Sequence, residues 1–346
     1  MFQEQLLSRI HDQFLVCLAG ILLLLAGCKP GSRGREDAIV VFGALDAPAG
    51  NYVYLYSFPD TAAVYGMEKA IMDSCIIDEN GNFELIAPVG FPVAFDVSYG
   101  NDLLVSNLFA CPGDVLEIYF TGEEHVPEVI DKNDVGKFNS FLVSLADSFY
   151  HDPVVKHEYY VTSNYLDGQQ YEQYTGERRQ QELNFFNNYF RDDSLRGEYR
   201  EYALNTIEYG VAVDRLMYVW KKRMKGQSVV IDPSYFSFLT PAFVNNASGF
   251  NCPAYMRFLN LYIKETYERK LDTGELKPGP GMNVSVEKFK IAERLLPMPY
   301  RNAVIYNIVL GDMQGISGGD GGERNSLSLD SMIRYFKTKH AREFAL

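Results

Sequence analysis

The apolar residues of this chain change their spacing near residue 131, and the change predicts two structural units. Between residues 38 and 121, short β-branched and aromatic runs alternate with turn residues, which is typical of β-strands. Beyond residue 131, apolar residues recur at steps of three and four, which is typical of packed helices. We therefore expect an α+β fold, with an N-terminal antiparallel β-sandwich over residues 38–125 followed by an all-α helical domain over residues 131–346.

Two turn signals divide the strand region. Asn80-Gly81 separates the apolar runs of SCIIDENGNFELIA, and this dipeptide tolerates the positive φ of a tight turn, so we expect a β-hairpin there. Pro112-Gly113 opens a second turn, and the alternating run VLEIYF follows it. At this spacing, about six or seven strands are expected.

The clearest helix lies within residues 194–224. One face of it carries Leu195, Tyr199, Tyr202, Thr206, Tyr209, Val213, Leu216 and Trp220. We expect further helices over residues 138–150, 178–191, 253–270, 285–296 and 299–313, and a last short one within 326–344. The glycine-rich segment 315–325 lacks the GK[ST] ending of a phosphate loop, and we interpret it as a surface loop.

The N-terminus has the features of a secretory signal. Residues 14–27 form an uncharged apolar run, too short for a bilayer span of about twenty residues but of the length of a signal h-region. It ends in Leu25-Ala26-Gly27-Cys28, which resembles the bacterial lipobox, where small residues give a peptidase access and the cysteine thiol takes a diacylglycerol. We expect residues 1–27 to be a lipoprotein signal peptide, residues 28–37 a linker, and Cys28 the lipid attachment site.

An ordinary signal peptide, or a buried helix with a coincidental cysteine, is the alternative. This alternative is favoured by the segment before the apolar run, which contains one positive side chain, Arg9, and two negative ones, Glu4 and Asp12. With the lipobox, the expected location is the bacterial cell envelope, lipid-anchored. Because Lys29-Pro30 follows the cysteine without an acidic cluster, the periplasmic side is expected.

The net charge and the motifs that are missing from the sequence argue against several classes of function. The formal net charge is -13 and no Lys/Arg stripe offsets it, so nucleic acid is not an expected partner. Neither a GxSxG elbow nor an HExxH motif occurs, and His151 and His157 are six apart, which fits no helical metal pair. We expect no catalytic residues, no metal site and no cofactor.

Five cysteines are present: Cys17, Cys28, Cys75, Cys111 and Cys252. No two are separated by two residues, so there is no CxxC redox pair. A structural disulfide between Cys75 and Cys111 is a candidate if their strands are neighbours with Cα atoms within about 7 Å. The alternative is that both are free core residues. Cys252, ahead of a helix, is expected to be packed and inert.

Tyrosines crowd one polar stretch, namely Tyr159, Tyr160, Tyr165, Tyr171 and Tyr174. Aromatic side chains of this kind either form a binding surface or pack along a helical bundle. We favour packing.

Three segments together resemble a sandwich domain of unknown function found in lipoproteins of the Bacteroidota. They are YVYLY, DSCIIDENGNFEL and LFACPGDVLEIYF, and the pattern falls on Asp73, Ser74, Gly81, Phe83, Pro112, Gly113 and Asp114. The stretch MYVWKKRMKG looks like the helical middle segment of the same proteins. In many such relatives a thioredoxin-like domain of the TlpA disulfide-reductase type follows, with a CxxC pair. Here the resemblance covers about residues 38–340 and does not include that domain.

The leading hypothesis is a membrane-anchored, periplasm-facing lipoprotein that acts as a non-catalytic binding or scaffolding module. The alternative, implied by the resemblance, is a truncated or partner-dependent member of the thioredoxin-like thiol–disulfide oxidoreductase family. In either case the expected partners are the membrane, through the lipid anchor, and a periplasmic protein such as a thioredoxin-like one.

Overall fold

The computed structural model describes residues 35–47, 49–57, 70–122, 126–130, 132–151, 153–191, 194–226, 232–277, 279, 282–298 and 300–313. The expected lipid attachment residue Cys28, its box Leu25-Ala26-Gly27 and the helix expected within 326–344 lie outside these residues. Among the residues described, no helix is both long and apolar enough to cross a bilayer.

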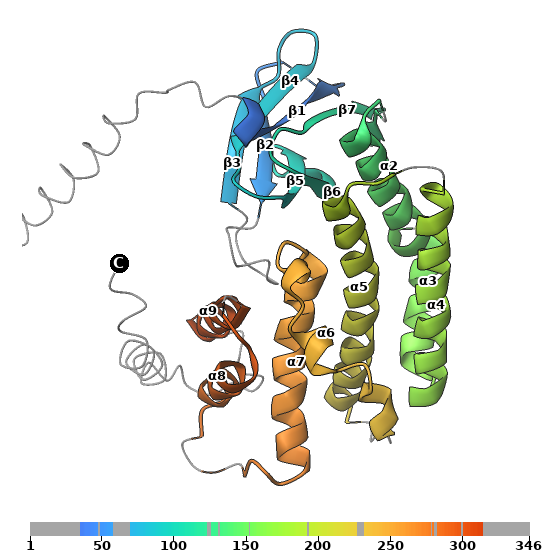
Figure 1. Cartoon of the computed structure of the whole chain (residues 1–346), viewed down its shortest axis with the longest axis vertical. Coiled ribbons are helices and arrows are strands. Elements are labelled where there is room, and N and C mark those ends of the chain that lie inside the picture. The colour runs from blue at the N-terminus through green and yellow to red at the C-terminus, as the bar shows by residue number, and fades with distance from the viewer. Residues whose placement is uncertain are drawn as a thin grey trace, which may run out of the picture.

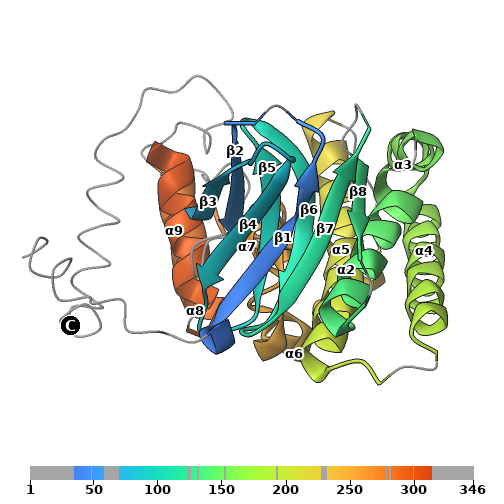
Figure 2. The same cartoon turned by 90° about the horizontal axis from the view of Figure 1, so that it is seen from above.

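Two four-stranded sheets form the N-terminal part, with the orders β4-β1-β7-β8 and β3-β2-β5-β6. Figure 2 shows them as two layers. All strand pairs are antiparallel except β1 with β7, which is parallel. The strands are β1 (Ala38–Leu45), β2 (Tyr52–Ser57), β3 (Ala70–Ile76), β4 (Asn82–Pro88), β5 (Val93–Tyr99), β6 (Asp102–Ala110), β7 (Val115–Thr121) and β8 (Val126–Val129), and the short 3-10 turn η1 (Arg35–Asp37) precedes them.

Helices make up the remainder of the described chain, so the expected α+β fold is confirmed. They are α2 (Asp134–Ala146), α3 (Pro153–Tyr165), α4 (Gly168–Tyr189), α5 (Gly197–Met224), α6 (Pro241–Val244), α7 (Pro253–Asp272), α8 (Val284–Leu295) and α9 (Tyr300–Met313), with a π-helical turn η2 (Asp147–His151) and 3-10 turns η3 (Pro233–Phe236) and η4 (Ala247–Gly249). In Figure 1, α5 and α7 stand side by side below the sandwich, with α3 and α4 on one flank and α8 and α9 on the other.

The core of the sandwich is formed by side chains that alternate along the strands between buried and exposed positions. On β4, every second residue is buried, and Phe83, Leu85 and Ala87 join Val41 of β1 and Leu55 of β2 in one apolar cluster. The two sheets therefore cover each other through their inward side chains, as a period of two predicts.

The hairpin expected at Asn80-Gly81 is wrong in one respect. The turn forms, with Gly81 at φ 83° and the Asp78 carboxylate accepting from the backbone N–H groups of Asn80 and Asn82 at 2.8 Å. However, β3 pairs with β2 while β4 pairs with β1, so the chain crosses from one sheet to the other at this turn. Asp73 of β3 links the two layers by accepting from the Ile86 N–H at 2.6 Å.

Helix α5 is the central helix. Its expected face is buried at Tyr199, Tyr202, Tyr209, Val213 and Leu216. Residues outside that face, such as Ile207 and Val219, are buried as well, because α4 and α7 pack against α5 from different sides. The sandwich core and the helix core belong to one continuous apolar cluster.

Candidate functional site

A cleft of about 320 Å³ lies where the sandwich meets the helices, and we call it the junction cleft. It is bounded by β6, α2, η2, α5 and the start of α7. Its apolar lining consists of Leu142, Leu145, Ala146, Tyr202, Val213, Pro253 and Ala254, and its polar lining of Ser106, Asn107, Tyr150, Thr206, Asp214 and Arg257. Apolar and polar residues contribute to this lining in similar numbers, and the volume is at the lower end of the range for small-molecule sites, about 300 to 1,000 Å³.

A β-bulge shapes the sheet side of the cleft. Asn107 has φ 59°, and among the residues described it is the one non-glycine residue with positive φ. The β5–β6 register shifts beside it, between Phe95 and Val97, and the buried Asp96 carboxylate accepts from the Asn107 N–H at 2.8 Å. Bulges of this kind redirect side chains next to functional sites. Here the bulge places Ser106 and Asn107 in the cleft wall.

The π-helical turn η2 supplies the next group. Tyr150 of η2 directs its hydroxyl to both carboxylate oxygens of Glu182, at 3.1 Å each. Gly210 of α5 permits this approach, since an added Cβ would lie 3.3 Å from the Tyr150 Oη. Short π-helical segments occur frequently at functional sites.

A buried charge cluster stands behind the cleft wall. Arg178 Nη2 donates to Asp214 Oδ2 at 2.5 Å, and its Nε lies 3.1 Å from Glu182 Oε1 without the direction of a hydrogen bond. One guanidinium thus faces two carboxylates. Because Glu182 is fully buried, desolvation raises its pKa to about 7 against the opposing effects of Arg178 and of the Tyr150 hydrogen bond. Only Asp214, 18% exposed, reaches the cleft.

Two side chains fix the cleft walls to each other. Asn139 of α2, fully buried, accepts from the Phe109 N–H at 2.8 Å and donates to the Phe109 carbonyl at 2.9 Å. Asp114, in the turn before β7, accepts from the Tyr199 hydroxyl at 2.5 Å and from Arg196 Nη1 at 2.9 Å. Each bond joins the sandwich to a helix, so the sheet side and the helix side of the cleft hold a defined spacing.

The structure separates the cysteines. Cys75 lies on β3 and Cys111 directly follows β6, at opposite edges of the same sheet. With strands about 4.8 Å apart, three steps across the sheet alone separate them by at least about 14 Å, twice the reach of a disulfide. The pairing register adds to this separation, because it sets Cys75 level with Asp102, at the other end of β6 from Cys111. Both thiols are free, so the condition for the candidate bridge is not met. Burial, followed by the nearby Asp114, raises the pKa of Cys111 to about 11.

Cys252 is packed, as expected. It is 1% exposed at the start of α7, and burial raises its pKa. Its Sγ lies 3.7 Å from the Oγ1 of Thr206, a residue of the cleft lining. The three described cysteines do not form a pair suited to thiol–disulfide exchange.

The five tyrosines of the tyrosine-rich stretch differ in burial, and Tyr159 and Tyr174 are half-buried. Tyr171 is fully buried and stacks on Tyr218 with ring centroids 4.2 Å apart, as packing predicts. Tyr160 and Tyr165 are instead 62% and 77% exposed.

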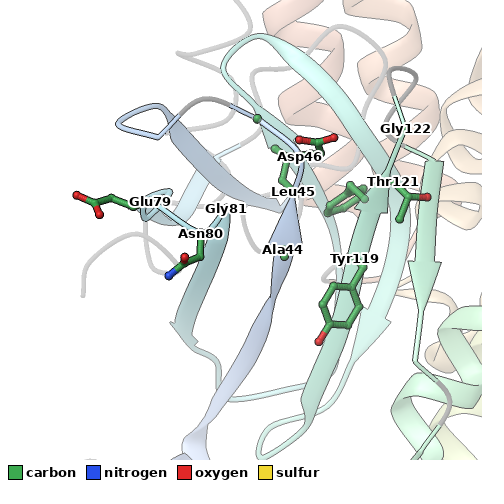
Figure 3. Close-up of a pocket in the computed structure, with 11 residues that line it drawn as sticks. Ala44, Leu45, Asp46, Glu79, Asn80, Gly81, Tyr119, Thr121 and Gly122 are labelled. Atoms are coloured by element: carbon green, nitrogen blue, oxygen red, sulfur yellow. The ribbon is translucent and has the colours of Figure 1, made fainter.

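Two further hollows are less suited to a ligand. Figure 3 shows an open one at the end of the sandwich, where Glu79 and Asn80 lie on the far side from Tyr119 and Thr121, so the polar groups do not converge. The other, between α7 and α8, contains Arg269 and Lys270. These cations lie in the last turn of α7, where they complement the partial negative charge of the helix terminus.

Within the described residues, no group of three or more His, Cys, Asp or Glu side chains is arranged to hold a metal ion. Sequence reasoning did not identify Asn107, Tyr150, Asp214 or Arg257 as site residues. The one available signal was Ser106-Asn107, a polar pair that interrupts the apolar run LLVSNLFA.

Comparisons with protein-family models, with curated proteins and with solved structures give no match to this chain.

Proposed function

We propose that this chain is a lipid-anchored protein of the bacterial cell envelope that acts as a non-catalytic binding module, with the junction cleft as its ligand site. The observation that carries the proposal is that three unfavourable features meet at this cleft. They are the left-handed backbone of Asn107, the π-helical turn at Tyr150 and the buried cluster around Arg178. Each costs free energy in folding, and such features concentrate at functional sites.

The anchor part of the proposal is supported by the run Leu25-Ala26-Gly27-Cys28. A diacylated or triacylated Cys28 would tether the sandwich through the short linker 28–37, because two or three acyl chains hold a protein stably where one does not. The periplasmic side remains the proposed location.

The oxidoreductase alternative receives no support from the described thiols. Exchange needs an attacking thiolate and a resolving thiol close by. Cys111 and Cys252 are both buried and both have raised pKa values, so they stay protonated at neutral pH. An insulin-reduction assay separates the hypotheses, since turnover by the purified chain alone would contradict a non-catalytic module.

Filling the cleft tests the ligand site. Ala254 lines the cleft, whereas Ala242 of α6 is exposed and is not part of its lining. A library of small amphiphilic fragments is screened by ligand-observed NMR against the parent, Ala254→Trp and Ala242→Trp proteins. We expect the hits to bind the parent and Ala242→Trp alike and to lose at least about tenfold in affinity on Ala254→Trp. Hits that bind all three proteins equally, or a screen without hits, would refute the cleft as the ligand site.

A further inference from the structure

We infer that Glu182 is a positioning residue of the junction cleft: when ionised it holds Tyr150 in the cleft wall, and when protonated it releases Tyr150. The cleft therefore changes its shape, and its affinity for a ligand, with pH. The inference rests on the proposed function, because it describes how that same site is regulated.

Tyr150 stands between the cleft and the buried carboxylate of Glu182. It belongs to the cleft lining, and its hydroxyl donates to the two carboxylate oxygens at 3.1 Å each. Gly210 also lines the cleft, and a Cβ added there would lie 3.3 Å from the Tyr150 Oη, which places this oxygen at the cleft wall. Among the residues described, Glu182 is the one hydrogen-bond partner of the hydroxyl, so it is the group that holds the ring in place.

The backbone that carries Tyr150 is a short connecting element. It is the π-helical turn η2, five residues long, between α2 and α3. Residues at the ends of elements are the ones that absorb changes of φ and ψ in conformational transitions. Tyr150 can therefore change its position while the interiors of α2 and α3 keep their packing.

Two carboxylates share the Arg178 guanidinium, and Glu182 is the less well paired of the two. Arg178 Nη2 donates to Asp214 at 2.5 Å, and the Tyr159 hydroxyl donates to Asp214 at 3.3 Å. Arg178 Nε lies 3.1 Å from Glu182 Oε1 but lacks the direction of a hydrogen bond. Because Glu182 is also fully buried, its ionised form is unfavourable, and it is the carboxylate of the pair that we expect to take up a proton.

The change falls near neutral pH and belongs to Glu182 alone. Burial raises the pKa of Glu182 to about 7, against the effects of Arg178 and of the Tyr150 hydrogen bond, while the Asp214 charge acts in the same direction as burial. Burial also raises the pKa of Tyr150 and of Tyr159, so both stay protonated over this range. Burial opposes the charge of Arg178, but Asp214 raises the pKa of the guanidinium and keeps it charged.

The strength of the hydrogen bond from Tyr150 depends on the charge of Glu182. An ionised carboxylate accepts a charge-assisted bond, which is roughly twice as strong as a bond between neutral groups. The same coupling is seen from the other side, since the Tyr150 bond lowers the pKa of Glu182. Tyr150 is therefore held above about pH 7 and released as the pH falls below it.

Hydroxyl-radical footprinting of the full chain tests the release of Tyr150. The protein is oxidised at pH 5, 6, 7 and 8, and peptide mass spectrometry gives the oxidation of Tyr150 relative to that of Tyr165. Tyr165 is 77% exposed, so the ratio cancels the effect of pH on the radical dose. We expect the ratio to be about threefold or more higher at pH 5 than at pH 8, with its midpoint near pH 7.

Two variants separate positioning by charge from a structural role. Glu182→Gln is neutral at every pH, so its ratio should be high throughout and should not change with pH. Glu177→Gln, at an exposed position of the same helix α4, is the matched control and should keep the profile of the parent. A parent ratio that is equal from pH 5 to pH 8, or a Glu182→Gln protein that follows the parent profile, would overturn the inference.

The outcomes separate this inference from the proposed function. Footprinting needs no ligand, so its failure refutes the regulation and leaves the cleft to the fragment screen, whereas a failed screen refutes the ligand site and leaves the footprinting result standing. Hits without a titratable group are then measured at pH 5.5 and pH 8. We expect their affinity to change about threefold or more for the parent and not for Glu182→Gln, and a constant affinity for the parent would contradict the coupling to binding.

Discussion

Asn139 is a single side chain that takes the place of a neighbouring strand. β6 is an edge strand, and the Asn139 amide makes with Phe109 the two bonds that a paired strand residue would make. The substitution Asn139→Leu leaves a buried N–H and a buried carbonyl without partners, so we expect a loss of about 2–4 kcal/mol in the free energy of unfolding. Urea denaturation measures it.

Ser140→Ala is the control for that substitution. Ser140 is the next residue on α2, and its hydroxyl makes one bond, to the Val129 carbonyl at 3.1 Å. We expect the Ser140→Ala variant to lose about 1 kcal/mol or less in the free energy of unfolding. Equal losses in the two variants would mean that Asn139 does not complete the sheet edge.

Glu182 should make stability depend on pH. The pKa of Glu182 is about 7 in the folded protein, whereas the ordinary value of 4.5 applies in the unfolded chain. A carboxyl with a raised folded pKa binds its proton more tightly in the folded state. Its contribution is therefore fully present below about pH 4.5 and is lost as the pH rises through about 7.

The variant Glu182→Gln keeps the neutral form at every pH. We expect the parent to lose stability relative to this variant between about pH 4.5 and 7, by an amount on the order of 3 kcal/mol. Urea denaturation of both proteins at pH 5, 6 and 7 measures the difference. A difference that stays constant over this range would show that Glu182 is ionised throughout.

At the scale of elements, the turn before β7 positions the start of α5. Arg196 is the N-cap residue of α5, but its side chain makes no capping bond to the helix backbone. Instead, the Asp114 carboxylate accepts hydrogen bonds from Arg196 and from Tyr199, which lies in the first turn of α5. Gly113 at φ 86° lets the turn close in this form. One carboxylate thus joins the sandwich to the central helix.

A double-mutant cycle tests this link. We expect Asp114→Ala to cost about 2–4 kcal/mol, because it removes three charge-assisted bonds at a mostly buried site, from the Tyr199 hydroxyl, from Arg196 and from the Cys111 N–H. Tyr199→Phe is expected to cost about 1 kcal/mol. The double variant should cost less than the sum by about 1 kcal/mol or more, since the two residues share one interaction. Additive losses, measured by urea denaturation, would show that Asp114 and Tyr199 act independently.

For the whole molecule, the decisive residue is Cys28. Without its thiol no diacylglycerol can be attached, so Cys28→Ala should leave the protein uncleaved or soluble. Cell fractionation followed by mass spectrometry of the N-terminus distinguishes these products from the lipidated parent. A variant that is still cleaved and still fractionates with membranes like the parent would rule out the lipobox.

The sequence by itself determined the local features of the structure, namely which face of an element is buried and where turns form. Alternation marks the buried face of β4, and steps of three and four mark the buried face of α5, because a side chain's direction repeats with the period of its own element. The turn glycines Gly81 and Gly113 are local too, since positive φ is a property of one residue. Helix α4 begins before the expected residue 178 because Asp167 and Gln170 form a capping box ahead of a polar stretch.

Packing in three dimensions decided the rest. Period and turn mark β3 and β4 as two strands joined by a tight turn, but they do not show that the strands join different sheets. The same holds for the junction cleft, where Asn107, Tyr150, Asp214 and Arg257 come from four elements far apart in the chain. A hydrophobic pattern indicates that one face of an element is buried, but it does not indicate which other element packs against that face. Only the packing of α5 against α4, α7 and the sandwich edge brings these polar groups to one place.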